Sequence, residues 1–329
     1  MSERLEKIKA LSLLSGGLDS QLAVCVLREQ GIHVEGLTFE SPFFSSVNAR
    51  NAAESLGIPL RVVDFTNEII ELLKNNKHGF GAGMNPCIDC HAVMIKKAGM
   101  IMGQMGFHFL STGEVLNQRP MSQNRQSLNV VMDESGCGEF LVRPLSARLL
   151  AETEPEKRGW VDRSRLLAIE GRNRKAQYKL ARHFGLTNIP QPAGGCKLTE
   201  PNFCKRLMDL ARHEGLDLRI IRLLLLGRHF RLGSKIRVVV GRDESENGLL
   251  EETAELMGFI IQPEIVPGPS CLVSSEADEK QTLVAAAICA RYCDLEGEIP
   301  VSVKIVSASG TRTINVLPET RAEIERMRI

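Results

Sequence analysis

A short polar stretch, SGGLDS at Ser15–Ser20, lies between an apolar segment and a segment with a helical pattern. Two consecutive glycines let the backbone approach a ligand closely, because neither carries a side chain. Ser15, Asp19 and Ser20 are residue types that cap helices, and the free N–H groups at a helix start bind anions. We therefore expect phosphate to bind at Ser15–Ser20.

Cysteines form a second group of residues with the capacity for chemistry. Cys87 and Cys90 lie three residues apart in NPCIDCH, and Cys196 follows two glycines much later in the chain. CxxC spacing in a chain of this kind indicates metal or redox chemistry rather than a secreted disulfide framework. A structural zinc ion would need a fourth ligand besides these three thiols, such as His91 or Cys204.

The other cysteines are expected to be structural. Cys25 lies within an apolar helical pattern and is expected in the core. The remaining four have no ligand-like neighbour in the sequence and are given no role: Cys137, Cys271, Cys289 and Cys293.

The elements that must position these residues alternate between short apolar strands and helices. This pattern predicts an α/β domain with a doubly wound parallel sheet covered on both faces. Ligands bind such sheets beyond the carboxyl ends of the strands, where Ser15–Ser20 and Phe39 would lie. The predicted strands are 8–14, 33–39, 60–65 and 107–112, and the predicted helices are 21–30, 46–56 and 92–106.

Length and composition predict two or three globular domains. The chain has 329 residues, of which 43% are hydrophobic, and its net charge is +1. No segment approaches the roughly 18 apolar residues of a membrane span, so we expect a soluble, cytoplasmic protein without a membrane partner.

Charge is unevenly distributed along the chain. Residues 157–182 contain nine Lys or Arg and two acids, and residues 219–242 contain seven Lys or Arg and no acid. Residues 243–279 reverse the sign, with ten acids and no Lys or Arg. One such tract is commonly a solvated face, but two basic tracts favour a polyanionic partner such as RNA.

The SGGLDS loop lacks the lysine of GxxxxGK[ST] and the third glycine of GxGxxG. In its strand–loop–helix context it resembles the pyrophosphate-binding loop of the PP-loop ATP pyrophosphatases, an adenine nucleotide α-hydrolase-like family that splits ATP to adenylate a substrate. The resemblance covers roughly residues 5–200 and implies that ATP and Mg²⁺ bind here, with Asp19 also catalytic. The ATP-binding residues that it implies are Ser15, Gly16, Gly17, Asp19, Ser20, Thr38, Phe39, Gly113 and Gln118.

NPxxxC followed much later by GGC resembles the tRNA-specific 2-thiouridylases, in which a cysteine at each place handles sulfur. Cys90 and Cys196 occupy those positions and would be catalytic. The additional Cys87 makes the pattern closer to the tRNA thiolases that hold a 4Fe-4S cluster on three thiolates, so that all three cysteines would be metal ligands. A persulfide-transferring pair, a zinc site and unreactive buried thiols stay open as alternatives.

The sequence TGEVLNQRP, after the strand expected at 107–112, resembles the second phosphate-side loop of thiouridylases. Gly113 permits close approach there, while Asn117, Gln118 and Arg119 can donate hydrogen bonds to a triphosphate or to RNA. An ordinary strand-to-helix turn is the alternative.

A second, smaller α+β module is expected beyond residue 200, so that the predicted domains are 1–200 and 201–329. VGRDxxEN at Val240–Asn247 and the elements after it resemble the NFACT-R domain, an RNA-binding module, over roughly residues 215–320. Phe259–Ser270 departs from that pattern, because it lacks the usual aromatic-histidine segment. The predicted RNA-binding residues are Arg119, Arg172, Arg174, Lys175, Arg228, Arg231, Lys235 and Arg242.

Together these patterns predict an AMP-forming tRNA sulfurtransferase. It would adenylate a uridine carbonyl in tRNA and then transfer sulfur from the cysteine-held site, as sulfide on a 4Fe-4S cluster or as a persulfide. Sulfide or a sulfur-carrier protein would be the donor, and the oligomeric state is left open, a homodimer being one option. The alternatives are an ATP-binding RNA-binding protein without sulfur transfer and a small-molecule ATP-dependent ligase.

Overall fold

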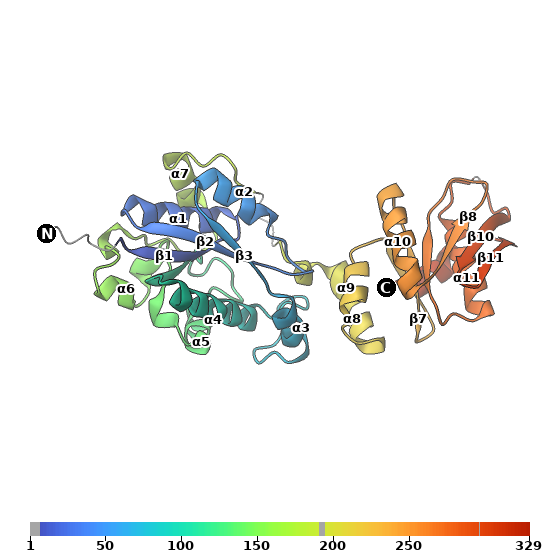
Figure 1. The fold of residues 1–329 in the computed structure, drawn as a ribbon, viewed down its shortest axis with the longest axis horizontal. Coiled ribbons are helices and arrows are strands. Elements are labelled where there is room, and N and C mark those ends of the chain that lie inside the picture. The colour runs from blue at the N-terminus through green and yellow to red at the C-terminus, as the bar shows by residue number, and fades with distance from the viewer. Residues whose placement is uncertain (1–6, 191–194, 296) are drawn as a thin grey trace. The chain divides into compact units, whose positions relative to one another are not determined.

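The computed structural model describes residues 7–190, 195–295 and 297–329. They form two compact units, Met1–Thr199 and Glu200–Ile329, whose elements are drawn in Figure 1. None of the helices in these described ranges combines the length and the apolar character that a bilayer crossing requires.

The first unit is built on a five-stranded parallel sheet in the order β3-β2-β1-β4-β5. The chain moves outward from β1 to β3 and then returns to β4, so the strand order reverses between β1 and β4. This arrangement confirms the predicted doubly wound sheet and places a ligand site beyond the carboxyl ends of β1 and β4. The strands are β1 (Lys9–Leu13), β2 (His33–Glu40), β3 (Leu60–Asp64), β4 (Phe109–Thr112) and β5 (Leu141–Val142).

Helices cover both faces of this sheet. In Figure 1, α1, α2 and α7 lie on one face and α4 and α5 on the other. The α-helices are α1 (Leu18–Glu29), α2 (Val47–Leu56), α3 (Thr66–Lys74), α4 (Cys87–Met105), α5 (Arg125–Ser135), α6 (Glu154–Lys157) and α7 (Lys175–His183). Four 3₁₀ turns are η1 (Gly138–Phe140), η2 (Ala147–Leu149), η3 (Arg163–Arg165) and η4 (Lys197–Thr199).

Two helix starts differ from the sequence prediction. The helix predicted at 92–106 begins at Cys87, so Cys87 and Cys90 lie on its first turn rather than on a loop. Asp89 supports this start, because its carboxylate accepts hydrogen bonds from the backbone N–H groups of Lys77 and His78 and lies near the positive helix end.

The helix predicted at 21–30 begins at Leu18, with Gly17 as its N-cap and no side-chain cap. The predicted capping by serine and aspartate side chains is therefore wrong. The Ser20 hydroxyl instead donates to the carbonyl of Gly17.

The second unit contains a six-stranded antiparallel sheet in the order β11-β10-β8-β9-β7-β6, which confirms the predicted α+β module. Successive side chains of β7 point to opposite faces of this sheet. Val238 and Val240 pack in an apolar cluster with residues of α11, and Val239 packs in another with residues of α10. The elements are α8 (Pro201–His213), α9 (Leu218–Leu223), β6 (Arg228–Leu232), β7 (Ile236–Val240), α10 (Glu244–Met257), β8 (Gly258–Pro263), β9 (Cys271–Ser274), α11 (Glu279–Arg291), β10 (Val301–Ser307), β11 (Gly310–Val316) and α12 (Arg321–Met327).

The bend between β1 and α1 requires glycine at one position. Gly16 has a φ of 80°, and a Cβ there would overlap the backbone of Asn48 in α2. We expect Gly16→Ala to lower the free energy of unfolding by about 1–3 kcal/mol, measured by chemical denaturation.

Gly103→Ala is the matched control, because Gly103 is exposed in α4 and a Cβ there would meet nothing within 4 Å. That change should raise the free energy of unfolding by about 0.5–1 kcal/mol, since alanine favours helix. Equal effects of the two changes would contradict the close contact between the loop and α2.

Candidate nucleotide and thiol site

The loop after β1 presents backbone and hydroxyl groups at the start of α1. The Ser15 hydroxyl donates to the Ser20 hydroxyl at 3.3 Å and accepts from the Gly17 N–H at 3.4 Å. The twelve-residue helix α1 directs its positive dipole end toward this loop. These groups can bind an anion, as the sequence predicts.

The end of β4 packs directly against this loop. A Cβ at Gly113 would overlap the backbone of Asp19 and Ser20, so no larger residue fits without a shift. The carboxyl ends of β1 and β4 therefore meet at the point where the strand order reverses.

Asp19 is held by two side chains from distant segments. Its Oδ2 accepts from Gln118 Nε2 and from Arg174 Nη2, each at 2.7 Å. Gln177 in turn donates to Gln118 Oε1 at 2.9 Å. Asp19 Oδ1 is buried and has no hydrogen-bond partner among the described residues, which leaves one carboxylate oxygen for a cation.

Thr38 and Phe39 lie at the carboxyl end of β2, next to β1, and both are buried. The Phe39 ring contacts Phe65, with the centroids 5.3 Å apart. Their position at the strand ends agrees with the predicted place beside the nucleotide base.

A buried carboxylate, Glu114, follows Gly113 and connects the loop to α4. Its Oε2 accepts from Arg143 Nε at 2.8 Å, and its Oε1 lies 3.1 Å from His91 Nδ1. Burial alone would raise the pKa of Glu114, but Arg143 and His91 outweigh burial and hold the pKa well below its ordinary value of 4.5. Glu114 therefore stays ionised at neutral pH.

The three predicted cysteines are neighbours. Cys87 and Cys90 share one face of the first turn of α4, and Asn85 Nδ2 donates to Cys87 Sγ at 3.0 Å. Burial, and after it the neighbouring Cys196 and Cys87 thiols, raise the pKa of Cys90 well above its ordinary range. Cys90 is therefore a neutral thiol unless a metal ion or another cation stabilises the thiolate.

The segment that carries Cys196 is fixed by backbone hydrogen bonds. The N–H of Lys197 donates to the carbonyl of Phe43, and the N–H of Met84 donates to the carbonyl of Leu198. The first glycine of the GGC motif, Gly194, lies outside the described residues.

Whether these thiols suit a metal depends on the kind of donor atoms present and on how closely they approach one another. Three neighbouring thiols match a soft metal or an iron–sulfur centre in kind. In the described part of the chain, no three His, Cys, Asp or Glu side chains converge closely enough to share one metal ion, whereas the thiolates of a 4Fe-4S cluster each bind a different iron. His91, one suggested fourth zinc ligand, has Nδ1 paired with Glu114, and the other, Cys204, belongs to the second unit.

The predicted RNA-binding residues of the first unit include one partner of Asp19 and sequence neighbours of its two partners. Arg174 contacts Asp19 directly. Arg172 and Lys175, which lie before and after Arg174 in the sequence, are exposed. Arg119 is exposed next to Gln118, the other partner of Asp19. A polyanion held by these residues would lie beside the nucleotide loop.

The basic tract 219–242 is largely neutralised by acids outside it. Arg231, together with Arg237, pairs with Asp209 and Glu214 of the α8 region. The other predicted residues differ in exposure: Arg228 lies over the Tyr292 ring at 4.8 Å, Arg242 pairs with Glu246, and Lys235 is exposed.

Three cysteines of the second unit, to which the sequence assigns no role, lie in one apolar cluster: Cys271, Cys289 and Cys293. The Cys289 thiol donates to the backbone carbonyls of Ile261 at 3.7 Å and Pro269 at 3.5 Å, and the Cys293 thiol donates to the carbonyl of Cys289 at 3.5 Å. The pKa of Cys289 is raised by the neighbouring Cys271 thiol and by burial. These three residues come from β9, α11 and the turn after α11, which only the fold brings together.

Sequence reasoning gave no role to Glu114, Arg143, Gln21 or Gln177. Glu114 could have been found, because it follows a strand whose end was predicted at the ligand site. Arg143 and Gln177 carry no comparable local signal, since their partners lie 29 and 59 residues away in sequence.

Two family models match the chain, one in each unit. Residues 6–148 match the family model described as thiamine biosynthesis protein (ThiI), and residues 227–328 match the model described as NFACT protein RNA binding domain.

The similarity to curated relatives covers only part of each protein. The chain is 28% identical over 172 residues to the tRNA-specific 2-thiouridylase MnmA of Cytophaga hutchinsonii, which is 45% of this chain and 45% of that protein. It is 34% identical over 146 residues to a protein of Caldanaerobacter subterraneus named "Probable tRNA sulfurtransferase", which is 42% of this chain and 36% of that protein. The chain thus spans less than half the length of these relatives.

Among solved structures, the chain is similar to a 4-thiouridine synthetase in complex with RNA and ATP. The identity is 20% and the TM-score 0.39, over 65% of this chain and 52% of that one.

The depressed pKa of Glu114 makes stability depend on pH. As pH falls below about 4.5, the unfolded chain binds a proton at this carboxyl before the native protein does, so the free energy of unfolding decreases. Glu114→Gln should remove this contribution, flatten the decrease between about pH 5 and pH 3, and cost about 3–5 kcal/mol at pH 7.

Denaturant unfolding at several pH values would measure both effects. Glu139→Gln, at an exposed carboxyl of the same unit, is the control and should follow the wild type. If Glu114→Gln does not fold, the double variant with Arg143→Gln removes both charges and still tests the pH dependence. A wild-type pH dependence in the variant that folds would contradict the buried pair.

Proposed function

Because the chain joins a ThiI-family domain to an NFACT-type RNA-binding domain, we propose that it thiolates a uridine of tRNA at the expense of ATP. In this reaction a uracil carbonyl oxygen attacks the α-phosphate of ATP, and pyrophosphate leaves. Sulfur then attacks the activated carbon, and AMP leaves with the former carbonyl oxygen.

One structural feature supports this function above the others. Gly113 packs on the nucleotide loop, Glu114 follows it, and Glu114 pairs with His91, the residue after Cys90. This short path links the Ser15–Ser20 loop to the helix turn that carries Cys90 and supports an adenylating site close to the thiols. Sulfur transfer to an adenylated base requires that the ATP site and the sulfur-carrying thiols both contact the same nucleotide of the tRNA.

Residues of the nucleotide loop have distinct roles in the proposal. Ser15, Ser20 and the Gly17 N–H bind the pyrophosphate part of ATP, where negative charge increases as the bond to the α-phosphate breaks. The N-terminal end of α1 stabilises the same charge. Asp19 Oδ1 would hold Mg²⁺ on the phosphates, because its other oxygen is occupied by Gln118 and Arg174.

Sulfur is held at the thiol site. Cys87, Cys90 and Cys196 would be the ligands of a 4Fe-4S cluster, which when bound supplies an iron with an open position for sulfide. The raised pKa of Cys90 agrees with a thiol that needs a metal to become a thiolate. In the alternative chemistry, the outer sulfur of a persulfide on Cys196 attacks the activated carbon and AMP leaves. The Cys90 thiolate then attacks Cys196 Sγ, the persulfide S–S bond breaks with its electron pair on the transferred sulfur, and a Cys90–Cys196 disulfide remains.

The tRNA backbone is bound by the exposed basic residues near Asp19, together with the second unit. Arg172, Lys175 and Arg119 are the contacts proposed in the first unit, and Arg228, Lys235 and Arg242 in the second. Arg231 is left out, because two acids already surround it.

Thiolation can be tested with the full chain purified without oxygen and given ATP, Mg²⁺, sulfide and a tRNA transcript. Thiouridine is measured by retardation in a mercury-containing gel, and AMP by chromatography. We expect both products from the wild type. Cys87→Ala, Cys90→Ala and Cys196→Ala should each lose the iron and the brown colour, and lower thiouridine formation at least about a hundredfold.

Cys293→Ala, in the second unit, is the matched control and should keep the activity of the wild type. Loss of activity in Cys90→Ala and Cys196→Ala alone, without iron, would support the persulfide pair, and stoichiometric zinc without colour would support zinc. If all three variants stay active, thiolation is the wrong reaction, and an ATP-binding RNA-binding protein becomes the better description.

The proposed tRNA contacts should be sensitive to salt. We expect the double change of Arg172→Gln with Lys175→Gln to weaken tRNA binding and to reduce the slope of log K against log salt by about two. Filter binding over a salt series measures both.

The charge-matched control changes Lys74→Gln and Lys96→Gln, which are exposed on α3 and α4. This pair should leave the salt slope close to that of the wild type. Equal slopes for the two double variants would place the RNA surface elsewhere.

A further inference from the structure

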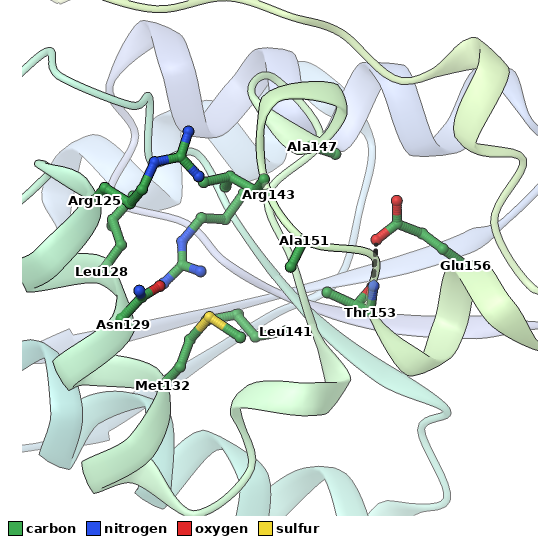
Figure 2. Close-up of a pocket in the computed structure, with 11 residues that line it drawn as sticks. Arg125, Leu128, Asn129, Met132, Leu141, Arg143, Ala147, Ala151, Thr153 and Glu156 are labelled. Carbon is green, nitrogen blue, oxygen red and sulfur yellow. Dashed lines mark hydrogen bonds between the residues drawn. The ribbon is translucent and has the colours of Figure 1, made fainter.

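A cavity of about 140 Å³ lies in the first unit, between α5 and the chain that follows β5. Leu128 and Leu141 form part of its buried wall, and Arg125 and Asn129 are exposed at its edge. Figure 2 shows the Arg143 side chain in the middle of this group, with Arg125 and Asn129 of α5 to one side and Glu156 to the other.

Arg143 is buried with part of its hydrogen-bonding capacity unused. The side chain is 2% exposed, and its Nε donates to Glu114. Its Nη2 is buried and has no hydrogen-bond partner in the part of the chain that the structure describes. An unpaired guanidinium nitrogen in a buried position is unfavourable, so an acceptor in the cavity would be stabilising.

The charges that face this cavity favour an anion. Arg125 contributes a second guanidinium, which donates to the backbone carbonyl of Leu149 and keeps its charge. The acid that lines the cavity, Glu156, is already occupied: its Oε2 accepts from the N–H and hydroxyl of Thr153, and its Oε1 pairs with Arg163. Two guanidinium groups therefore line the space. Arg143 and Glu156 are each paired with an opposite charge outside the lining, so the unbalanced positive charge comes from Arg125.

The size of the cavity narrows the choice of ligand. One water needs about 30 Å³, so the space exceeds a single water and is small for a nucleotide. Planar guanidinium groups bind the oxygens of phosphate-like and carboxylate groups in pairs. We propose that this cavity is a binding site for a small tetrahedral oxyanion of the phosphate or sulfate type, separate from the nucleotide loop.

The site is connected to the nucleotide loop through one residue. Arg143 lines the cavity and also holds Glu114, which follows the Gly113 that packs on Asp19. A bound oxyanion would compete with Glu114 for the same guanidinium. The cavity is thus placed to influence the nucleotide site without sharing its ligands.

Thermal unfolding of the full chain in phosphate, sulfate, acetate or chloride at matched ionic strength tests the site. Phosphate and sulfate should raise the unfolding temperature with a saturable dependence at millimolar concentrations, beyond the gradual effect of such salts on any protein. Arg125→Gln and Asn129→Leu should each weaken this binding by about tenfold, and neither residue is buried.

Arg148→Gln, at an exposed arginine outside the cavity lining, is the control and should bind as the wild type. Ser15→Ala separates this site from the nucleotide loop. Stabilisation lost in Ser15→Ala and retained in Arg125→Gln would assign the ion to the nucleotide loop and overturn the proposal. Equal stabilisation in acetate would identify a carboxylate site instead, and a linear response without saturation would mean that no site exists.

Discussion

The close approach of the end of β4 to the start of α1 is the constraint on which the first unit depends. Gly113 lies so near the backbone of Asp19 and Ser20 that a methyl group has no space. This contact brings Glu114 next to the nucleotide loop and fixes its distance from α4. The buried carboxylate then needs polar partners, and His91 and Arg143 supply them from two other segments of the chain.

Charge pairing has a comparable structural role in the second unit. Two arginines of the antiparallel sheet, Arg231 and Arg237, reach Asp209 and Glu214 of the preceding helical segment. Buried ion pairs of this kind contribute little net stability, but removing one partner leaves an unpaired charge. The network therefore joins residues 200–226, which lie outside the matched RNA-binding domain, to that domain.

The proposed thiol chemistry depends on the polarity of the site as much as on the cysteines. Cys90 is partly buried and lies among other thiols, and both conditions favour its neutral form. A metal or a persulfide would change that balance, because each stabilises negative charge on sulfur. A site that holds sulfur until an activated base arrives needs thiols that are unreactive on their own.

Local pattern in the sequence determined the elements of the sheet and the identity of the loop. Apolar runs, glycines at helix ends and the SGGLDS string are properties of neighbouring residues, so the doubly wound sheet and the phosphate-type loop could be predicted from them. The start of α4 could not be predicted from local pattern, because Cys87 and Asp89 are weak helix formers. The first turn is stabilised instead by hydrogen bonds from the N–H groups of Lys77 and His78 to the Asp89 carboxylate.

Tertiary structure alone decided which charges are available. In the sequence, the arginines of residues 219–242 look like one basic surface, yet Arg231 and Arg237 pair with acids at the end of α8. In the other basic tract, residues 157–182, Arg174 pairs with Asp19. The same holds for Cys271 and Cys289, whose contact depends on packing of α11 against β9. Burial and ion pairing arise between residues far apart in sequence, so no local pattern encodes them, whereas the loop and its strand are encoded within a few residues.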